Sequence, residues 1–129
     1  MAQKPGLVVA LQANYLQVEL DLIDEDFRSP PGLCKSKTFR LLCTRRSRLI
    51  HEGASVNVGD RVWVESIDWK EFRGVVSDVE PRKSWLERPP VANVSEVIVV
   101  LSLKQPSFDL DQASRFLVTA EQTGLSVRL

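Results

Sequence analysis

The first half of the chain alternates between apolar and polar residues with a period of two. Residues 15–22 follow this pattern cleanly, and the mostly apolar residues 7–13 precede them, with Asn14 between the two runs. Such alternation is typical of strands that have one face on a core and the other in water. Asparagine tolerates the backbone angles of tight turns, so the pattern predicts a β-hairpin or sharp bend.

Three further short strands are predicted, over residues 37–44, 61–65 and 74–79. Val58-Gly59-Asp60 is a turn signal before the second of them, and a polar turn precedes the third. Five short strands with little helical signal among them favour a small closed barrel or a sandwich. Because closure removes exposed strand edges, we expect a five-stranded OB-fold barrel (oligonucleotide/oligosaccharide-binding) over residues 1–80.

The pattern changes after residue 80. Three prolines disfavour a helix over residues 81–96, which we interpret as a proline-rich connector. Residues 97–103 form a continuous apolar run rich in β-branched residues, which is the pattern of a strand buried on both faces in a parallel sheet.

A helix is predicted after this run. Asp109 is the expected N-cap with Gln112 three residues later, and Gly124 is the expected stop. Apolar residues recur at three- and four-residue steps between them: Leu110, Ala113, Phe116, Leu117 and Ala120. Another strand begins at Leu125. Residues 97–129 therefore predict one β-α-β unit, the incomplete start of an α/β domain, in a chain that is mainly β.

Total composition narrows the function very little. The 17 basic and 17 acidic residues give a net charge of zero, and 43% of the residues are hydrophobic, as in globular proteins. No apolar run approaches the roughly 18 residues that span a bilayer, and the N-terminus lacks the apolar core of a secretory signal. We therefore expect a soluble, cytoplasmic protein with no membrane partner.

The distribution of charge is more informative than its sum. Residues 19–26 hold five acidic side chains and no basic one, whereas residues 35–48 hold six basic side chains and no acidic one. The basic block covers the third predicted strand and the loop after it, where barrels of this class bind nucleic acid. Guanidinium groups suit phosphate because their planar donors form paired hydrogen bonds. The candidate RNA-binding residues are Lys35, Lys37, Arg40, Arg45, Arg46 and Arg48. The alternative is a solvated basic rim that pairs with the acidic loop.

Catalytic, metal and cofactor motifs are not found in the sequence. It has no glycine-rich phosphate loop, and its single histidine, His51, is expected in an exposed loop. Cys34 and Cys43 form neither a zinc ligand set nor a disulfide framework, and Cys43 is interpreted as a small core residue. Tyr15, Phe39 and Trp63 are candidate base-stacking residues, although a core position is favoured for each.

Several short motifs together resemble one family. The motifs are Gly6-Leu-Val-Val9, Asn14-Tyr15, Cys43 followed by Arg45, Val58-Gly-Asp-Arg-Val62, Gly74-Val-Val-Ser-Asp-Val79, residues 81–94, 97–102 and 105–106, Ser114-Arg-Phe-Leu-Val118 and Ala120-Glu121. In this order they resemble the N-terminal part of the ribosome small-subunit-dependent GTPase A family, bacterial and plastid assembly factors with circularly permuted GTPase domains. Only residues 21–33 fall outside the resemblance, and residues 86–94 and 114–121 are its most specific stretches.

The resemblance implies an N-terminal OB barrel, then a GTPase domain and a zinc-binding region. GTP, magnesium and zinc are expected for the full-length family, but the guanine-specificity motif would follow the strand at Leu125, so none of the residues that bind them is expected here. The resemblance further implies that the barrel contacts ribosomal RNA of the small subunit near the decoding region. Members of the family act in the bacterial cytoplasm or in the plastid stroma. The plastid location needs a transit peptide, which is not seen here, so the bacterial cytoplasm is expected. Two departures are Thr44-Arg-Arg-Ser-Arg48, which has no glycine, and Ser95 where aspartate is common.

We therefore expect the segment of a ribosome-biogenesis GTPase that binds ribosomal RNA on the small subunit during late maturation, with no hydrolase activity of its own. The alternative is a stand-alone OB-fold RNA-binding protein without a GTPase partner domain. The incomplete β-α-β unit exposes apolar surface at residues 97–103 and 116–117, so self-association is also expected.

Overall fold

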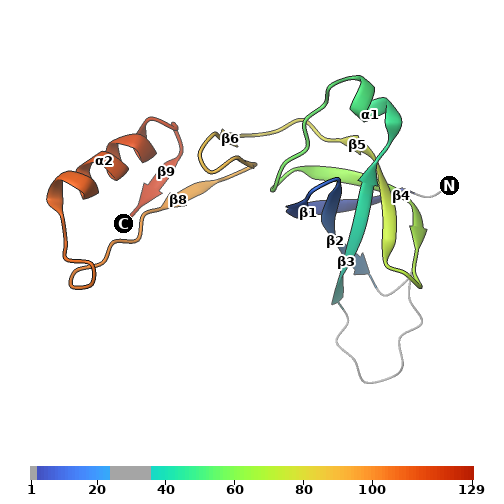
Figure 1. The fold of residues 1–129 in the computed structure, drawn as a ribbon, viewed down its shortest axis with the longest axis horizontal. Coiled ribbons are helices and arrows are strands. Elements are labelled where there is room, and N and C mark those ends of the chain that lie inside the picture. The colour runs from blue at the N-terminus through green and yellow to red at the C-terminus, as the bar shows by residue number, and fades with distance from the viewer. Residues whose placement is uncertain (1–2, 24–35) are drawn as a thin grey trace.

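In the computed structural model, which describes residues 3–23 and 36–129, the alternating first half of the chain forms five long strands (Figure 1). These are β1 (Lys4–Gln12), β2 (Tyr15–Ile23), β3 (Ser36–Arg45), β4 (Arg61–Asp68) and β5 (Arg73–Val79). They close into a barrel in the order β1-β2-β3-β5-β4, with β4 returning to pair with β1. Within the barrel, β3 and β5 pair in parallel and the other strand pairs are antiparallel. The predicted hairpin, the three later strands and the closed barrel are all confirmed.

The barrel core follows the period of two. Alternate residues of every strand are less than 5% exposed and point inward: Val8, Leu16, Val18, Leu20, Leu41, Cys43, Val62, Val64 and Val76. In β2 this alternation leaves Tyr15, Gln17 and Glu19 on the outer face. The strand register therefore decides which polar side chains any ligand on the outside of the barrel can meet.

A short helix, α1 (Ser47–His51), follows β3 and was not predicted. Its five residues are too few to show a helical period, and only Leu49 is buried, where it joins the barrel core together with Val56. The backbone N–H of Arg46 donates to the carbonyl of Val76 on β5, which ties the start of the helix to the barrel. His51 is exposed as predicted, but it ends this helix rather than lying in a loop.

The proline-rich connector is a second, smaller hairpin, β6 (Trp85–Leu86) and β7 (Val91–Ala92), that is bonded to the barrel. The N–H of Ala92 donates to the carbonyl of Val58 over 2.8 Å, and Nδ2 of Asn93 donates to the carbonyl of Gly59 over 2.9 Å. A Cβ on Gly59 would lie 2.1 Å from the Ala92 carbonyl oxygen, and its φ is +92°. Only glycine fits this approach, which explains the turn signal before β4.

A buried ion pair strengthens this attachment. Asp60 has no solvent exposure, and its carboxylate accepts from Nε and Nη2 of Arg82 over 2.9 and 2.8 Å. The Arg82 guanidinium also lies 4.3 Å from the centre of the Trp85 ring. Its hydrogen bonds to Asp60 raise the pKa of Arg82 above the usual arginine value. The hairpin is therefore part of the barrel rather than a free linker.

The remaining residues form the predicted β-α-β unit, on the left of Figure 1. It consists of β8 (Glu96–Ile98), α2 (Leu110–Glu121) and β9 (Ser126–Arg128), and the two strands are parallel. Asp109 caps α2 as predicted by accepting from the N–H groups of Asp111 and Gln112. Gly124 has a φ of +75°, which suits the glycine stop after the helix.

The prediction of a strand buried on both faces over residues 97–103 is wrong. The strand ends at Ile98, and Val100 and Leu103 are 87% and 76% exposed. The physical reason is that a two-stranded sheet with one helix has too few neighbours to cover both faces of a strand. Residues 97–100 instead line one wall of an open groove of about 330 Å³, with Phe116 of α2 and Leu86 of β6 among the other lining residues.

Candidate nucleic-acid interface

The structure separates the six predicted RNA-binding residues. Lys35 lies outside the described residues, and Lys37 takes a register position in β3 opposite Leu22. Arg40 also lies within β3, whereas Arg45 ends that strand and two arginines follow it. Since a strand rises about 3.3 Å per residue, Arg40 lies roughly 16 Å from Arg45 along β3. The block is therefore not a single patch.

Arg40 faces a carboxylate across the strand pair. It is opposite Glu19 of β2, and its Nε lies 3.6 Å from Oε2 of Glu19. The Arg40 side chain is 67% exposed, so this contact is loose and screened by water. Arg40 can release Glu19 and bind a phosphate instead. Because the Glu19 carboxylate stays close by and repels the phosphate, Arg40 contributes less to the affinity for RNA than an unpaired arginine.

Arg46 and Arg48 take part in holding the α1 corner together. Nη1 of Arg46 lies 2.9 Å from Oε1 of Glu65, a side chain on β4 that is only 17% exposed. Nη2 of Arg48 donates to the carbonyl of Ser77 over 3.1 Å, while its Nη1 lies 3.9 Å from Glu52. Both guanidinium groups remain more than half exposed, so each can meet a ligand on its outer side.

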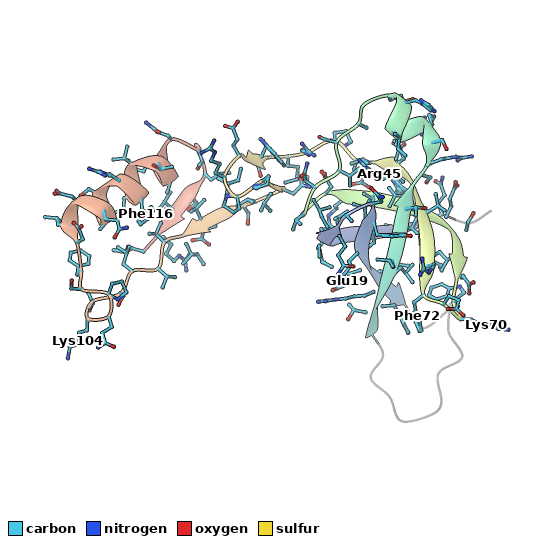
Figure 2. The ribbon with its side chains drawn as sticks, viewed as in Figure 1. Glu19, Arg45, Lys70, Phe72, Lys104 and Phe116 are labelled. Atoms are coloured by element: carbon cyan, nitrogen blue, oxygen red, sulfur yellow. The ribbon has the colours of Figure 1, made fainter. Side chains whose placement is uncertain are left out.

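Arg45 differs from its neighbours because it forms no ion pair with any residue in the described part of the chain. Its position opposite Val76 leaves it half-buried at the α1 end of the barrel, while Glu19 lies further toward the other end (Figure 2). Arg45, Arg46 and Arg48 together form a corner at the junction of β3 and α1, which we call the arginine corner. It is the part of the predicted block that the fold keeps together.

Sequence reasoning missed one pair on the outer face. The guanidinium of Arg73, at the start of β5, lies 5.8 Å from the centre of the Tyr15 ring, at the start of β2. Tyr15 is 38% exposed, so its expected core position is wrong, whereas Phe39 packs partly buried against the core and Trp63 is partly buried. Tyr15 and Arg73 are far apart in sequence. The one available signal was the alternation of β2, which places Tyr15 on the outer face of the strand.

Cys43, the other residue considered for chemistry, has a structural role. Cys43 is fully buried, and this burial raises the pKa of its thiol to about 12, with a backbone hydrogen bond involving Gly74 acting in the opposite direction. The thiol is therefore protonated at neutral pH and acts as a core residue, as predicted. Within residues 3–23 and 36–129, no group of three His, Cys, Asp or Glu side chains is placed to hold a metal ion. Nor does that part contain a helix long and apolar enough to cross a membrane.

Known relatives match the chain along almost its whole length. The small ribosomal subunit biogenesis GTPase RsgA of Prochlorococcus marinus strain MIT 9313 is 62% identical over 125 residues, which are 96% of this chain and 39% of that protein. The protein of the same name from Parasynechococcus marenigrum strain WH8102 is 61% identical over 129 residues, which are 100% of this chain and 40% of the relative. The chain thus spans about two fifths of these relatives.

Solved structures show the same fold. YjeQ from Thermotoga maritima superimposes with a TM-score of 0.70 at 29% identity, over 98% of this chain and 40% of that protein. YloQ, described as a circularly permuted GTPase, superimposes with a TM-score of 0.68 at 24% identity, over 98% and 39% of the two chains. Residues 79–129 match the model of the RsgA GTPase family. The resemblance seen in the sequence motifs is confirmed: the chain is similar over almost its whole length to about two fifths of the length of proteins named RsgA, and its residues 79–129 match the RsgA GTPase family model.

Proposed function

We propose that this chain is the RNA-binding part of a ribosome-biogenesis GTPase that acts late in small-subunit maturation. Through this part the GTPase would bind the small ribosomal subunit. The observation that carries the proposal is that relatives more than 60% identical over nearly the whole chain are named small ribosomal subunit biogenesis GTPases. The arginine corner supports it, because three arginines close together in the chain at the β3–α1 junction carry positive charge that suits the phosphates of folded RNA. The proposal places this action in the bacterial cytoplasm.

Nucleotide and metal binding are proposed to lie outside this chain. GTP, magnesium and zinc are expected for the whole family, but the described residues offer no cluster of metal ligands, and the sequence has no glycine-rich phosphate loop. The residues present do not fit these groups, so we propose that the chain alone does not turn over GTP. The exposed apolar residues after β8 also support the proposal that copies of this chain can associate.

The salt dependence of binding to purified small subunits tests the docking proposal. We expect Arg45→Glu to weaken binding and to reduce the slope of log affinity against log salt by about one for each lost phosphate contact. Arg45 is the best site because Arg46 and Arg48 also hold Glu65 and the Ser77 carbonyl, so changing them would disturb the barrel.

The matched control is Arg115→Glu, on the exposed face of α2 in the second unit. This variant makes the same charge change away from the barrel and is expected to bind like the wild-type chain. Equal affinity of the Arg45 and Arg115 variants, with no dependence on salt, would refute the docking proposal. Binding to protein-free RNA but not to small subunits would favour a stand-alone RNA-binding protein instead.

A further inference from the structure

The Tyr15–Arg73 pair is a feature of the outer barrel face that lies outside the arginine corner. Tyr15 points outward because Leu16 and Val18, which follow it in β2, alternate into the core. Arg73 lies opposite Leu42 in the β3–β5 pairing. Since β3 lies between β2 and β5, the Arg73 side chain extends across β3 to reach the ring of Tyr15. Three neighbouring strands thus carry one polar–aromatic surface on the outside of the barrel.

The residues around this pair leave it open to a ligand. Gln12 of β1, the cross-strand partner of Tyr15, is exposed, and Gln17 is the next outward residue of β2. Gln17 provides an amide that can both donate and accept hydrogen bonds. The surface therefore combines a ring that is 38% exposed with adaptable amide groups beside it.

The carboxylates near this face are already engaged, so that Arg73 is available to a polyanion. Glu19 is a further outward residue of β2, Glu65 of β4 lies opposite Val75 of β5, and the carboxylate of each already has an arginine partner. Asp68, opposite Arg73 on β4, directs its carboxylate to the N–H groups of its own turn. The Arg73 guanidinium is stacked on a ring, and such exposed cation–π contacts are weak, so a ligand can replace them at little cost.

We propose that Tyr15 and Arg73 form a stacking site for an unpaired nucleobase of RNA, separate from the arginine corner. The inference rests on the proposed function, since it names the kind of RNA that the barrel reads. A tyrosine ring and a guanidinium plane both stack on the π-face of any base, and a free base face is available only in single strands, loops and bulges. Gln17 is placed to contact the edge of the stacked base, and duplex RNA is not a ligand of this site.

The test uses the whole chain and two RNA probes. One is a single-stranded RNA of about ten nucleotides that contains 2-aminopurine, whose fluorescence falls when it stacks on an aromatic ring; the other is the same sequence as a duplex. We expect the wild-type chain to quench the single strand. Tyr15→Leu, which keeps an apolar side chain but removes the ring, is expected to abolish the quenching and to weaken single-strand binding roughly tenfold.

Two conservative variants separate stacking from structure. Tyr15→Phe keeps the aromatic ring and is expected to retain quenching. Arg73→Lys keeps the positive charge but lacks the planar guanidinium, so it is expected to weaken the quenching. Phe108→Ala, which removes an exposed aromatic residue from the second unit, is the matched control and should behave like the wild type. Circular dichroism of each variant verifies that the barrel is folded.

The outcomes distinguish this inference from the proposed function. Unchanged quenching by Tyr15→Leu, equal losses on single strand and duplex, or no wild-type quenching at all would overturn the stacking site, even if Arg45→Glu still weakened small-subunit binding. Conversely, failure of the proposed function would show as wild-type binding to small subunits that is absent or independent of salt and of Arg45. Loss of quenching in Tyr15→Leu together with full quenching in Tyr15→Phe would support the stacking site.

Discussion

The barrel and the β-α-β unit contain similarly apolar stretches but bury them very differently. Val64 of β4 is fully buried, whereas Val100, which follows β8, is 87% exposed. In the closed barrel every strand has a hydrogen-bonded neighbour on both sides and a shared interior. The second unit has two short paired strands and a single helix. The difference teaches that burial is set by the number of neighbouring elements rather than by the hydrophobicity of the strand itself.

The β6–β7 hairpin belongs, by its contacts, with the barrel. Its bonds to Val58 and Gly59 and the buried Asp60–Arg82 pair fix it to the turn before β4. The boundary between the well-buried and poorly buried regions therefore lies after the hairpin. Measurements of the free energy of unfolding can locate this boundary.

The largest effect is expected from Arg82→Ala. Removing this guanidinium leaves the carboxylate of Asp60, which has no solvent exposure, without its cation. Breaking a buried ion pair in this way costs about 3–5 kcal/mol of the free energy of unfolding. Urea unfolding followed by tryptophan fluorescence measures the loss, with Lys83→Ala, at an exposed neighbouring position, as the control. A loss below about 1 kcal/mol would mean that the hairpin is only loosely attached to the barrel.

Patterns within single strands were predictable, whereas contacts between distant residues were not. The alternation in residues 15–22 correctly predicted β2 and its buried face, and the Asp109 cap was also visible in the sequence. The hairpin at residues 85–92 was missed because it depends on pairing with Val58, more than thirty residues away. Helix α1 was missed because one buried residue in five shows no period.

The candidate site shows the same division. The basic residues of the arginine corner were visible as a run, but their partners Glu65 and Ser77 come from later strands and could not be assigned. Tyr15 and Arg73 meet only because β3 brings β2 and β5 to its two sides. Local sequence thus identified which side chains are available, and strand order determined which of them act together.

A matched pair of valine changes tests the central comparison directly. Val64→Ala removes buried methyl groups from the barrel core and is expected to cost about 2 kcal/mol of the free energy of unfolding. Val100→Ala makes the same chemical change at an exposed position and is expected to stay within about 0.5 kcal/mol of the wild type. Chemical denaturation of the two variants side by side measures both values. Equal costs would show that Val100 is buried in solution, for instance between associated copies.

A smaller effect than that of Val64→Ala is expected from Asp109→Ala at the start of α2. The Asp109 carboxylate accepts from the N–H groups of Asp111 and Gln112 over 3.0 and 3.3 Å, and loss of such a cap costs about 1 kcal/mol of helix stability. Because α2 packs mainly on β9, the loss should appear as faster amide hydrogen exchange in residues 110–121, while exchange in the barrel strands stays unchanged. Lys104→Ala, an exposed change in the loop before the helix, is the control. If barrel strands exchanged faster as well, the two regions would unfold as one cooperative unit, and the poorly buried region would be held by the barrel rather than by its own contacts.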